Sequence, residues 1–238
     1  MAIVKIPAII LKCDNYRETS KIVTFYTPEH GKLRGIAKGV RNSKSKWGGA
    51  LQSMAYVNMI FYLKENRTLH LISGAEYAGN IQNISDDYDK MKIGFRIIEL
   101  INQTTPEHHE NRELFGLLVH SLKMLNDATK NYVNLLFNFE FSMLKLLGFE
   151  VDSELYSEGS VEKSKRNSYV YDTRIDAGDR KIMSALSSGN FNSLMSLNIT
   201  KSQEIFLDRF FENYVRDHFE HAGYLKSKRV FESKEMIL

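Results

Sequence analysis

Short apolar runs and alternating apolar and polar positions dominate about the first eighty residues of the chain. β-Branched and aromatic residues are concentrated in these runs, which is typical of β-strands. Turn chemistry separates the runs, most clearly between Pro28 and Gly31, because proline fixes φ and glycine permits a positive φ. The pattern predicts five short strands, at residues 3–11, 21–27, 32–40, 55–63 and 69–72.

Helical periodicity replaces this alternation in the next part of the chain. Apolar residues recur there every three or four positions, as on one face of an α-helix. Polar residues 85–87 precede the first stripe and are suited to cap a helix N-terminus. We predict three helices whose apolar stripes begin at Met91, Leu114 and Leu135, the last of them ending at Gly148.

The stretch that follows is polar and rich in serine. It predicts a loop or insert over residues 149–177, within which residues 169–171 favour a short strand. Helical periodicity then returns over residues 179–186 and 202–221.

Together these patterns predict an α+β protein with two domains. Five strands in so short a segment are typical of a small β-barrel of the OB type, an architecture that often binds oligonucleotides. We therefore predict an OB-fold β-barrel over residues 1–80 and a helical domain over residues 81–238, with the polar insert at residues 149–177.

Composition excludes several classes of protein. Hydrophobic residues make up 43% of the 238 residues. A helix needs a run of about 18 apolar residues to cross a membrane, and no apolar run in the sequence is that long. Cys13 is the only cysteine, so neither an intrachain disulfide nor a thiolate zinc cluster can form. The N-terminus lacks a signal-peptide pattern, and we expect a cytoplasmic protein with no membrane association.

The distribution of charge is more informative than the net charge of +3. No aspartate or glutamate occurs between His30 and Lys64, whereas residues 32–46 contain six cations. Such a segment suits phosphate oxygens, because cations that neutralise phosphates release counterions from nucleic acid. The alternative is an ordinary solvated basic loop. The predicted DNA-binding residues are Lys32, Arg34, Lys38, Arg41, Lys44 and Lys46.

Residue parity and nearby aromatic residues refine this prediction. Lys32, Arg34 and Lys38 share a parity, so on a strand they tend to lie on one face. Aromatic rings offer stacking faces for bases, each worth about 1–3 kcal/mol when used. The candidates are Phe25, Tyr26, Tyr56 and Trp47, of which Trp47 is expected more in the barrel interior than on a binding face.

Two other groups of residues resemble metal sites. Asp172, Asp176 and Asp179 would serve as magnesium ligands of a nuclease, although aspartates at a strand end more commonly make local hydrogen bonds. His218 and His221 lie three residues apart on a predicted helix, without a third ligand at a convincing spacing. A metal-dependent nuclease and a protein scaffold that binds acidic partners remain the alternatives to a DNA-binding protein.

Several segments resemble the family of the bacterial DNA repair protein RecO. The similarity is strongest over residues 1–80 and moderate over the helices. Its most specific elements combine a Glu-Thr-Ser sequence with a basic, glycine-containing strand. The matching segments are residues 18–20, 24–27, 31–41 and 49–52, and near the far end Tyr214, His218 and residues 225–227.

The resemblance implies an OB-fold, a helical domain, no cofactor and no catalytic turnover. Members of that family bind single- and double-stranded DNA, anneal complementary strands and work with RecR in the RecF pathway. They help to load RecA onto strands coated by single-stranded DNA-binding protein, which implies a nucleoid-associated protein. The resemblance places Arg34, Lys38, Arg41 and Lys44 on the strand and loop presented to DNA.

Two further expectations concern the helical domain. The acidic, hydrophobic-ended C-terminal tail of single-stranded DNA-binding protein is a candidate ligand near Lys123, Lys130 and Lys145, although such lysines are more commonly solvated. Many relatives carry a four-cysteine zinc site after a Leu-Gly-Phe element, here residues 147–149. Residues 150–176 contain no cysteine, so zinc binding is not carried over to this chain.

Overall fold

The computed structural model divides the chain into two compact units. The first contains residues 2–126 together with Ser227, and the second contains residues 127–226. The predicted domain boundary after residue 80 stays a prediction. The structure describes residues 2–43, 45–64, 67–151, 161–163, 170–172, 175, 177–220, 222–223 and 225–227.

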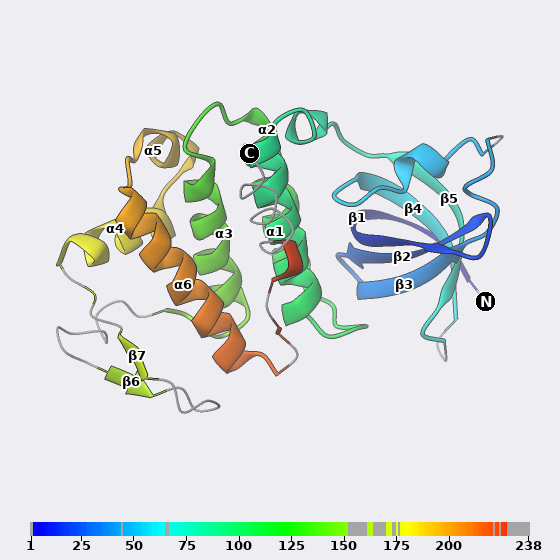
Figure 1. Ribbon diagram of the computed structural model, residues 1–238. Coiled ribbons are helices and arrows are strands. Elements are labelled where there is room, and N and C mark those ends of the chain that lie inside the picture. The colour runs from blue at the N-terminus through cyan, green and yellow to red at the C-terminus, as the bar shows by residue number, and fades with distance from the viewer. Residues whose placement is uncertain are drawn as a thin grey trace. The chain divides into compact units, whose positions relative to one another are not determined.

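Five strands form a closed barrel in the first unit (Figure 1). They are β1 (Ala2–Tyr16), β2 (Ser20–Thr27), β3 (Gly31–Ala37), β4 (Tyr56–Leu63) and β5 (His70–Tyr77). Their order around the barrel is β1-β2-β3-β5-β4, and only the pairing of β3 with β5 is parallel among these strands. The N-terminal half of β1 pairs with β4 and its C-terminal half with β2, which closes the sheet. The predicted α+β fold with an N-terminal barrel is confirmed.

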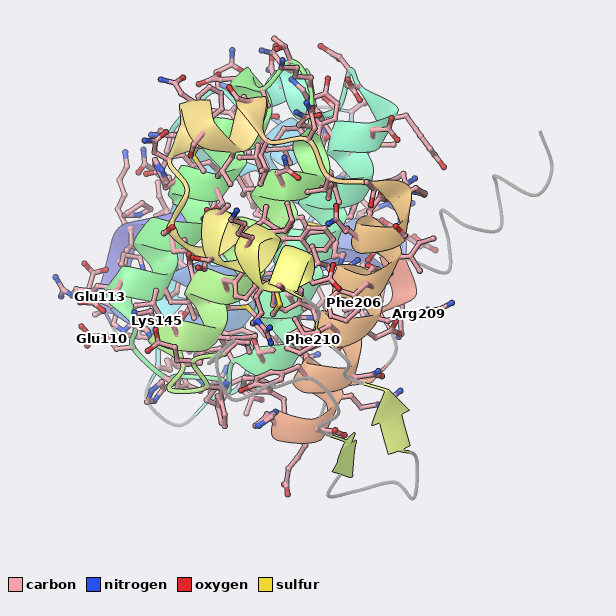
Figure 2. All side chains as sticks on the ribbon, turned by 90° about the vertical axis from the view of Figure 1, so that its left-hand side faces the viewer. Glu110, Glu113, Lys145, Phe206, Arg209 and Phe210 are labelled. Carbon is pink, nitrogen blue, oxygen red and sulfur yellow. The ribbon has the colours of Figure 1, made fainter. Side chains whose placement is uncertain are left out.

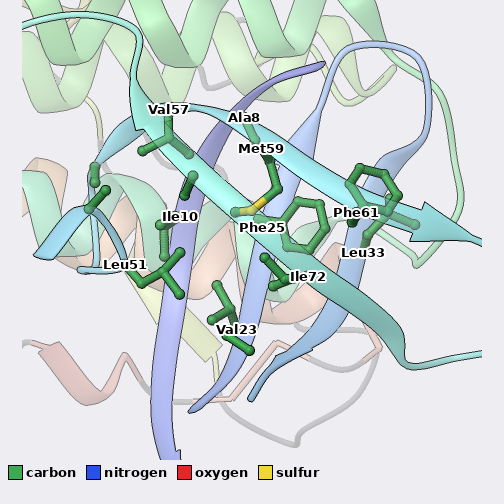
Figure 3. Packing of buried hydrophobic residues seen from close by; sticks show 14 of the residues in the cluster. Ala8, Ile10, Val23, Phe25, Leu33, Leu51, Val57, Met59, Phe61 and Ile72 are labelled. Atoms are coloured by element: carbon green, nitrogen blue, oxygen red, sulfur yellow. The ribbon is translucent and has the colours of Figure 1, made fainter. Parts of the chain in front are cut away.

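Alternate residues of the strands fill the barrel with apolar side chains (Figure 3). Phe25 and Phe61 lie near its centre, fully buried, with their ring centroids 5.4 Å apart in an edge-to-face arrangement. Trp47 is partly buried and packs against this core, as expected for a barrel residue. The other core residues labelled in Figure 3 are Ala8, Ile10, Val23, Leu33, Leu51, Val57, Met59 and Ile72.

Two long helices complete the first unit. They are α1 (Tyr88–Thr104) and α2 (Arg112–Asp127). Short 3-10 turns lie at Gly48–Ala50, between β3 and β4, and at Gln82–Ile84, before α1. The Asp87 carboxylate accepts hydrogen bonds from the N–H groups of Asp89 and Lys90, so the predicted N-cap of α1 is confirmed. Phe115 of α2 packs beside Tyr26 and Tyr56 on the outer surface of the barrel, at ring-centroid distances of 6.4 and 6.5 Å.

The second unit is built around α3. Its elements are α3 (Tyr132–Leu146), β6 (Val161–Lys163), β7 (Val170–Asp172), α4 (Ala177–Ser188), α5 (Phe191–Ser196) and α6 (Lys201–His218). Phe211 of α6 is fully buried between two phenylalanines of α3, stacked on Phe137 at 5.9 Å and edge-on to Phe141 at 4.7 Å. These contacts hold α6 against α3.

Two asparagines on α3, and Asn131 directly before it, bind backbone carbonyl groups near the C-terminal ends of α4 and α5. Asn134 donates its amide to the carbonyl oxygens of Leu194 and Leu197, both at 2.8 Å. Asn138 donates in the same way to Leu186 of α4 at 2.8 Å. Because the last carbonyl groups of a helix have no intrahelical partner, these amides replace water where the helix ends are buried. Asn131 contributes the same kind of bond to Met195 and Leu197.

The predicted helices and strands are present, with differences at their ends. α5 was not predicted, because six residues are too few to show a helical period. β6 was not predicted either, since its segment is polar. β1 continues past its predicted end to Tyr16 through a register shift between Ile10 and Lys12. The prediction of a short strand near residue 170 is confirmed by β7.

His70 is a buried histidine at the start of β5. It is 1% exposed. Burial lowers the pKa of His70 below the usual 6.5, and His108 and His30 act in the same direction. The backbone of Tyr62 and the carboxylate of Glu107 oppose this shift.

The pKa of His70 predicts a loss of stability in acid. The unfolded chain takes up this proton near pH 6.5 and the folded chain does so only at lower pH. The stabilisation is therefore complete above pH 6.5 and is lost as the pH falls through the folded-state pKa, by at most about 1.4 kcal/mol per pH unit. Urea unfolding followed by Trp47 fluorescence should show that wild type loses more stability than His70→Leu between pH 7 and 5. A stability difference that does not change with pH would contradict the assignment.

Candidate nucleic-acid interface

The outer face of β3 carries the first cations of the basic segment. Leu33 and Ala37 point into the barrel, so the residues between them alternate outward. Lys32 and Arg34 lie on this outer face, and Lys38 directly follows the last residue of the strand. The prediction that Lys32 and Arg34 share a face is confirmed.

Three of the predicted DNA-binding side chains are open to solvent. Arg34, Lys38 and Lys46 are exposed, and none of them has a hydrogen bond or ion pair within the described residues. They are therefore available to an anionic ligand. Lys44 lies outside the described residues.

Lys32 is less accessible than its neighbours on the basic segment. Its ammonium group donates a hydrogen bond of 2.6 Å to the carbonyl oxygen of Asn102 near the end of α1, and the side chain is half-buried. Desolvation lowers the pKa of Lys32, while Glu107 acts in the opposite direction. In this structure Lys32 attaches α1 to the barrel, where a cation is favourable at a helix C-terminus. Its assignment to DNA stays a prediction.

Arg41 connects the loop that follows β3, residues 38–47, to the turn between β1 and β2. We call residues 38–47 the basic loop. Its guanidinium group donates to the carbonyl oxygens of Arg17 at 3.2 Å and Glu18 at 3.0 Å. Its backbone N–H donates to the carbonyl of Thr19 at 2.9 Å. The side chain is exposed, so its remaining donors can still meet a phosphate, but its replacement would also disturb the loop.

The base of the basic loop is ordered by contacts to the barrel. The Lys21 ammonium donates to the carbonyl of Leu51 at 2.8 Å. A Cβ on Gly48 would lie 2.4 Å from the carbonyl oxygen of Val40. The backbone at Gly48 can therefore approach the backbone at Val40 this closely only because Gly48 has no side chain. The cations of this loop thus extend from a fixed base.

The prediction that Phe25 and Tyr26 offer stacking faces to bases is wrong. Phe25 is in the barrel core, and Tyr26 is 1% exposed beneath Phe115 of α2, where burial raises its pKa to about 12. Tyr56 is partly buried by the same phenylalanine, and the ammonium of Lys123 lies 5.8 Å from its ring centroid. Alternation along a strand distinguishes two faces, but it does not say which outer residues a helix covers.

The residues considered for metal binding do not assemble within the described part of the chain. No group of three or more histidine, cysteine, aspartate or glutamate side chains there is arranged to hold a metal ion. Asp176, the side chain of Asp172 and His221 lie outside the described residues. His218 stacks on Tyr214, and its Nδ1 lies 2.8 Å from that residue's carbonyl oxygen.

Cys13 is a structural residue rather than a nucleophile. Its Sγ lies 3.4 Å from the carbonyl oxygen of Leu51, and burial raises the pKa of the thiol to about 11. A thiol with this pKa stays protonated near neutral pH.

The lysines considered for a peptide tail have different surroundings. Lys130 is exposed, whereas Lys145 forms a 2.6 Å ion pair with Glu150 at the end of α3. Figure 2 shows Lys145 apart from the aromatic residues Phe206 and Phe210, which lie on α6 with Arg209 between them in sequence. No helix among the described residues is long and apolar enough to cross a membrane.

Comparison with known proteins agrees with this architecture. A family model described as recombination protein O N terminal matches residues 1–81, the barrel segment. A second model, described as recombination protein O C terminal, matches residues 85–229. The chain belongs to the RecO family. The sequence resemblance to that family is thereby confirmed, and a role in DNA repair and recombination follows from it.

RecO proteins of several bacteria align with most of the chain. The DNA repair protein RecO of Salinibacter ruber is 28% identical over 242 residues, which cover 96% of this chain and 93% of that protein. RecO of Chlorobium limicola is also 28% identical, over 245 residues that cover 92% and 94% of the two chains. RecO of Chloroherpeton thalassium is 32% identical over 148 residues, or 62% of this chain.

Proposed function

We propose that the N-terminal barrel binds single- and double-stranded DNA through its phosphates and anneals complementary strands without catalysing a reaction. The observation that carries this proposal is the exposure of Arg34, Lys38 and Lys46, three cations with no partner in the described part of the chain, on a barrel of the RecO family. Arg41 and Lys44 belong to the same proposed surface, with Arg41 acting partly through the loop that it holds.

The chemistry of this surface favours binding that ignores sequence. Lysine and arginine side chains recognise phosphate oxygens, which every nucleotide carries, and each neutralised phosphate releases condensed counterions. Two strands near such a surface repel each other less, because the cations screen their charges. Annealing then needs proximity and reduced repulsion, and no bond in the DNA changes.

The proposal extends to partners that RecO relatives imply. We propose that the protein works with RecR and helps to load RecA onto single strands coated by single-stranded DNA-binding protein. Contact with the C-terminal tail of that protein, near Lys123 or Lys130, is part of the proposal. Lys145 is a weaker candidate because Glu150 neutralises it.

A salt titration tests the central claim. The purified protein is expected to bind a fluorescently labelled single strand at 50 mM salt and to lose affinity steeply by 200 mM, with a linear dependence of the logarithm of the binding constant on that of salt. It is also expected to anneal complementary oligonucleotides in the presence of EDTA. Absence of binding in dilute buffer would overturn the proposal.

The same experiment separates the alternatives. Cleavage that requires magnesium would indicate the nuclease. Binding of acidic peptides without any binding of oligonucleotides would indicate the protein scaffold.

A further inference from the structure

An apolar row crosses the outside of the barrel next to the proposed phosphate-binding cations. Side chains that point away from the core are usually polar on a solvated sheet, so apolar residues at several adjacent outward positions indicate a binding surface. Here the strand registers place four of them side by side. The row, which we name the apolar band, consists of Ile22 on β2, Ile36 on β3, Leu71 on β5 and Tyr62 on β4.

The register of the sheet makes the apolar band continuous. Ile22 is opposite Ile36, Ile36 is opposite Leu71, and Leu71 is opposite Tyr62. In the antiparallel pairs, directly opposed residues lie about 4.5–5.5 Å apart at their Cβ atoms, so neighbouring members of the band are within reach of one another. Four strands at about 4.8 Å spacing give the band a length of roughly 14 Å. Ile3, which is 66% exposed, continues it on β1 beside Tyr62.

The helices of the first unit contact the barrel elsewhere along the same strands. Phe115 of α2 packs against Tyr26 and Tyr56, four and six residues along β2 and β4 from the band. α1 is bonded to Lys32, four residues along β3 from Ile36, and it also contacts β1. Each residue of the band is accordingly only partly buried.

Charge distinguishes the ligand that fits this surface. Arg34 lies two residues before Ile36 along the chain and Lys38 two residues after it. Lys64 follows Tyr62 by two residues. β3, β4 and the loop between them contain no carboxylate. The carboxylate nearest in register is Asp14, opposite Ile22, which is paired with Lys12 at 2.5 Å. A row of apolar side chains between cations matches unpaired nucleobases between phosphates.

We propose that the apolar band binds the faces of unpaired bases, with Tyr62 as its stacking residue, so that the barrel prefers single-stranded to duplex DNA. This inference rests on the proposed function. In a duplex the base faces are already stacked on one another, and only phosphates and base edges are accessible. The cations act on both forms of DNA, whereas the apolar band acts on single strands alone.

The test compares substitutions on and off the apolar band. Tyr62→Thr removes the ring and replaces it with a β-branched residue, which also favours a strand. We expect it to weaken binding to a labelled single strand by about 5- to 150-fold, to change duplex binding by less than about twofold, and to leave the salt slope unchanged. Ile36→Thr should act in the same direction with a smaller effect. Tyr62→Phe, which retains an aromatic face, should keep the single-strand affinity.

Tyr77→Thr is the matched control. Tyr77 is also an exposed tyrosine on the barrel, at 56%, and it lies at the far end of β5 opposite Val57, away from the apolar band. Its hydroxyl donates to the carbonyl oxygen of Gly49 at 2.9 Å, close to the base of the basic loop, so any loss that acts through the loop should affect single strands and duplex alike. The ratio of the two affinities should therefore stay unchanged in Tyr77→Thr. Equal losses on single strands and duplex in Tyr62→Thr, or no loss on either, would overturn the inference while the proposed function stands. Failure of the wild-type protein to bind any DNA would remove both.

Discussion

Reversal of two charges, in the variant Arg34→Glu with Lys38→Glu, is expected to weaken binding to single strands of any sequence by roughly 10- to 100-fold at about 100 mM salt. Both side chains are exposed and have no partner among the described residues, so their loss removes phosphate contacts without breaking contacts within the protein. The slope of binding against salt should become shallower by about 1.4 on single strands and about 1.8 on duplex, because two phosphate contacts are lost. Fluorescence anisotropy over a range of salt concentrations measures both quantities.

A control with the same change in net charge tests whether position matters. Lys181→Glu with Lys201→Glu reverses two exposed lysines on α4 and α6 of the second unit. This variant should retain nearly all of the affinity and the full salt slope. If both double variants lose the same affinity, the binding depends on net charge rather than on the face of β3. If neither loses any, the cations assigned here do not contact DNA.

Strand alternation and helical periodicity were sufficient to predict most of the fold. The core residues of β2 and β3 alternate with outward ones in the printed sequence, and the stripes of α1, α2 and α3 follow the helical period. The elements that these two patterns did not predict lie in short or polar segments. The asparagines of α3 bind carbonyl groups 48 or more residues away, as Asn138 does with Leu186 and Asn134 with Leu194, and no spacing along the chain indicates such partners.

The candidate site was predictable as a segment, but not residue by residue. A run of cations without carboxylates indicated the strand and loop on which the structure shows Arg34, Lys38 and Lys46 to be exposed. The same run includes Lys32, whose partner Asn102 is 70 residues away, and Arg41, which binds the turn after β1. The apolar band was not visible either, because it depends on strand register. Its members come from four strands, and register follows from barrel closure rather than from any one strand's pattern.

Gly31→Ala is expected to lower the free energy of unfolding of the first unit by about 2–5 kcal/mol, the largest effect of a single methyl group that we predict. Gly31 begins β3 with a φ of +60°, a conformation that costs a residue with a side chain about 1–2 kcal/mol. A Cβ there would also lie 2.0 Å from the carbonyl oxygen of His109. That backbone must move, which adds the cost of overpacking.

Gly116→Ala is the matched control for this prediction. Gly116 lies on the exposed face of α2, and a Cβ there would meet no atom within 4 Å. Alanine should stabilise the helix by up to about 1 kcal/mol. Urea unfolding followed by the fluorescence of Trp47, the only tryptophan, measures both variants on the barrel itself.

Comparison of Gly31→Ala with Gly31→Asn distinguishes a local from a long-range role of Gly31. The turn before β3 already explains a positive φ, and that part was predictable from Pro28 and Gly31 alone. If strain in the turn were the whole cost, Gly31→Asn, which tolerates a positive φ, would recover most of the stability. The approach of His109 predicts instead that Gly31→Asn is about as unstable as Gly31→Ala, because both carry the Cβ that meets the carbonyl group. Recovery of wild-type stability by asparagine would show that the segment before α2 does not pack on this turn.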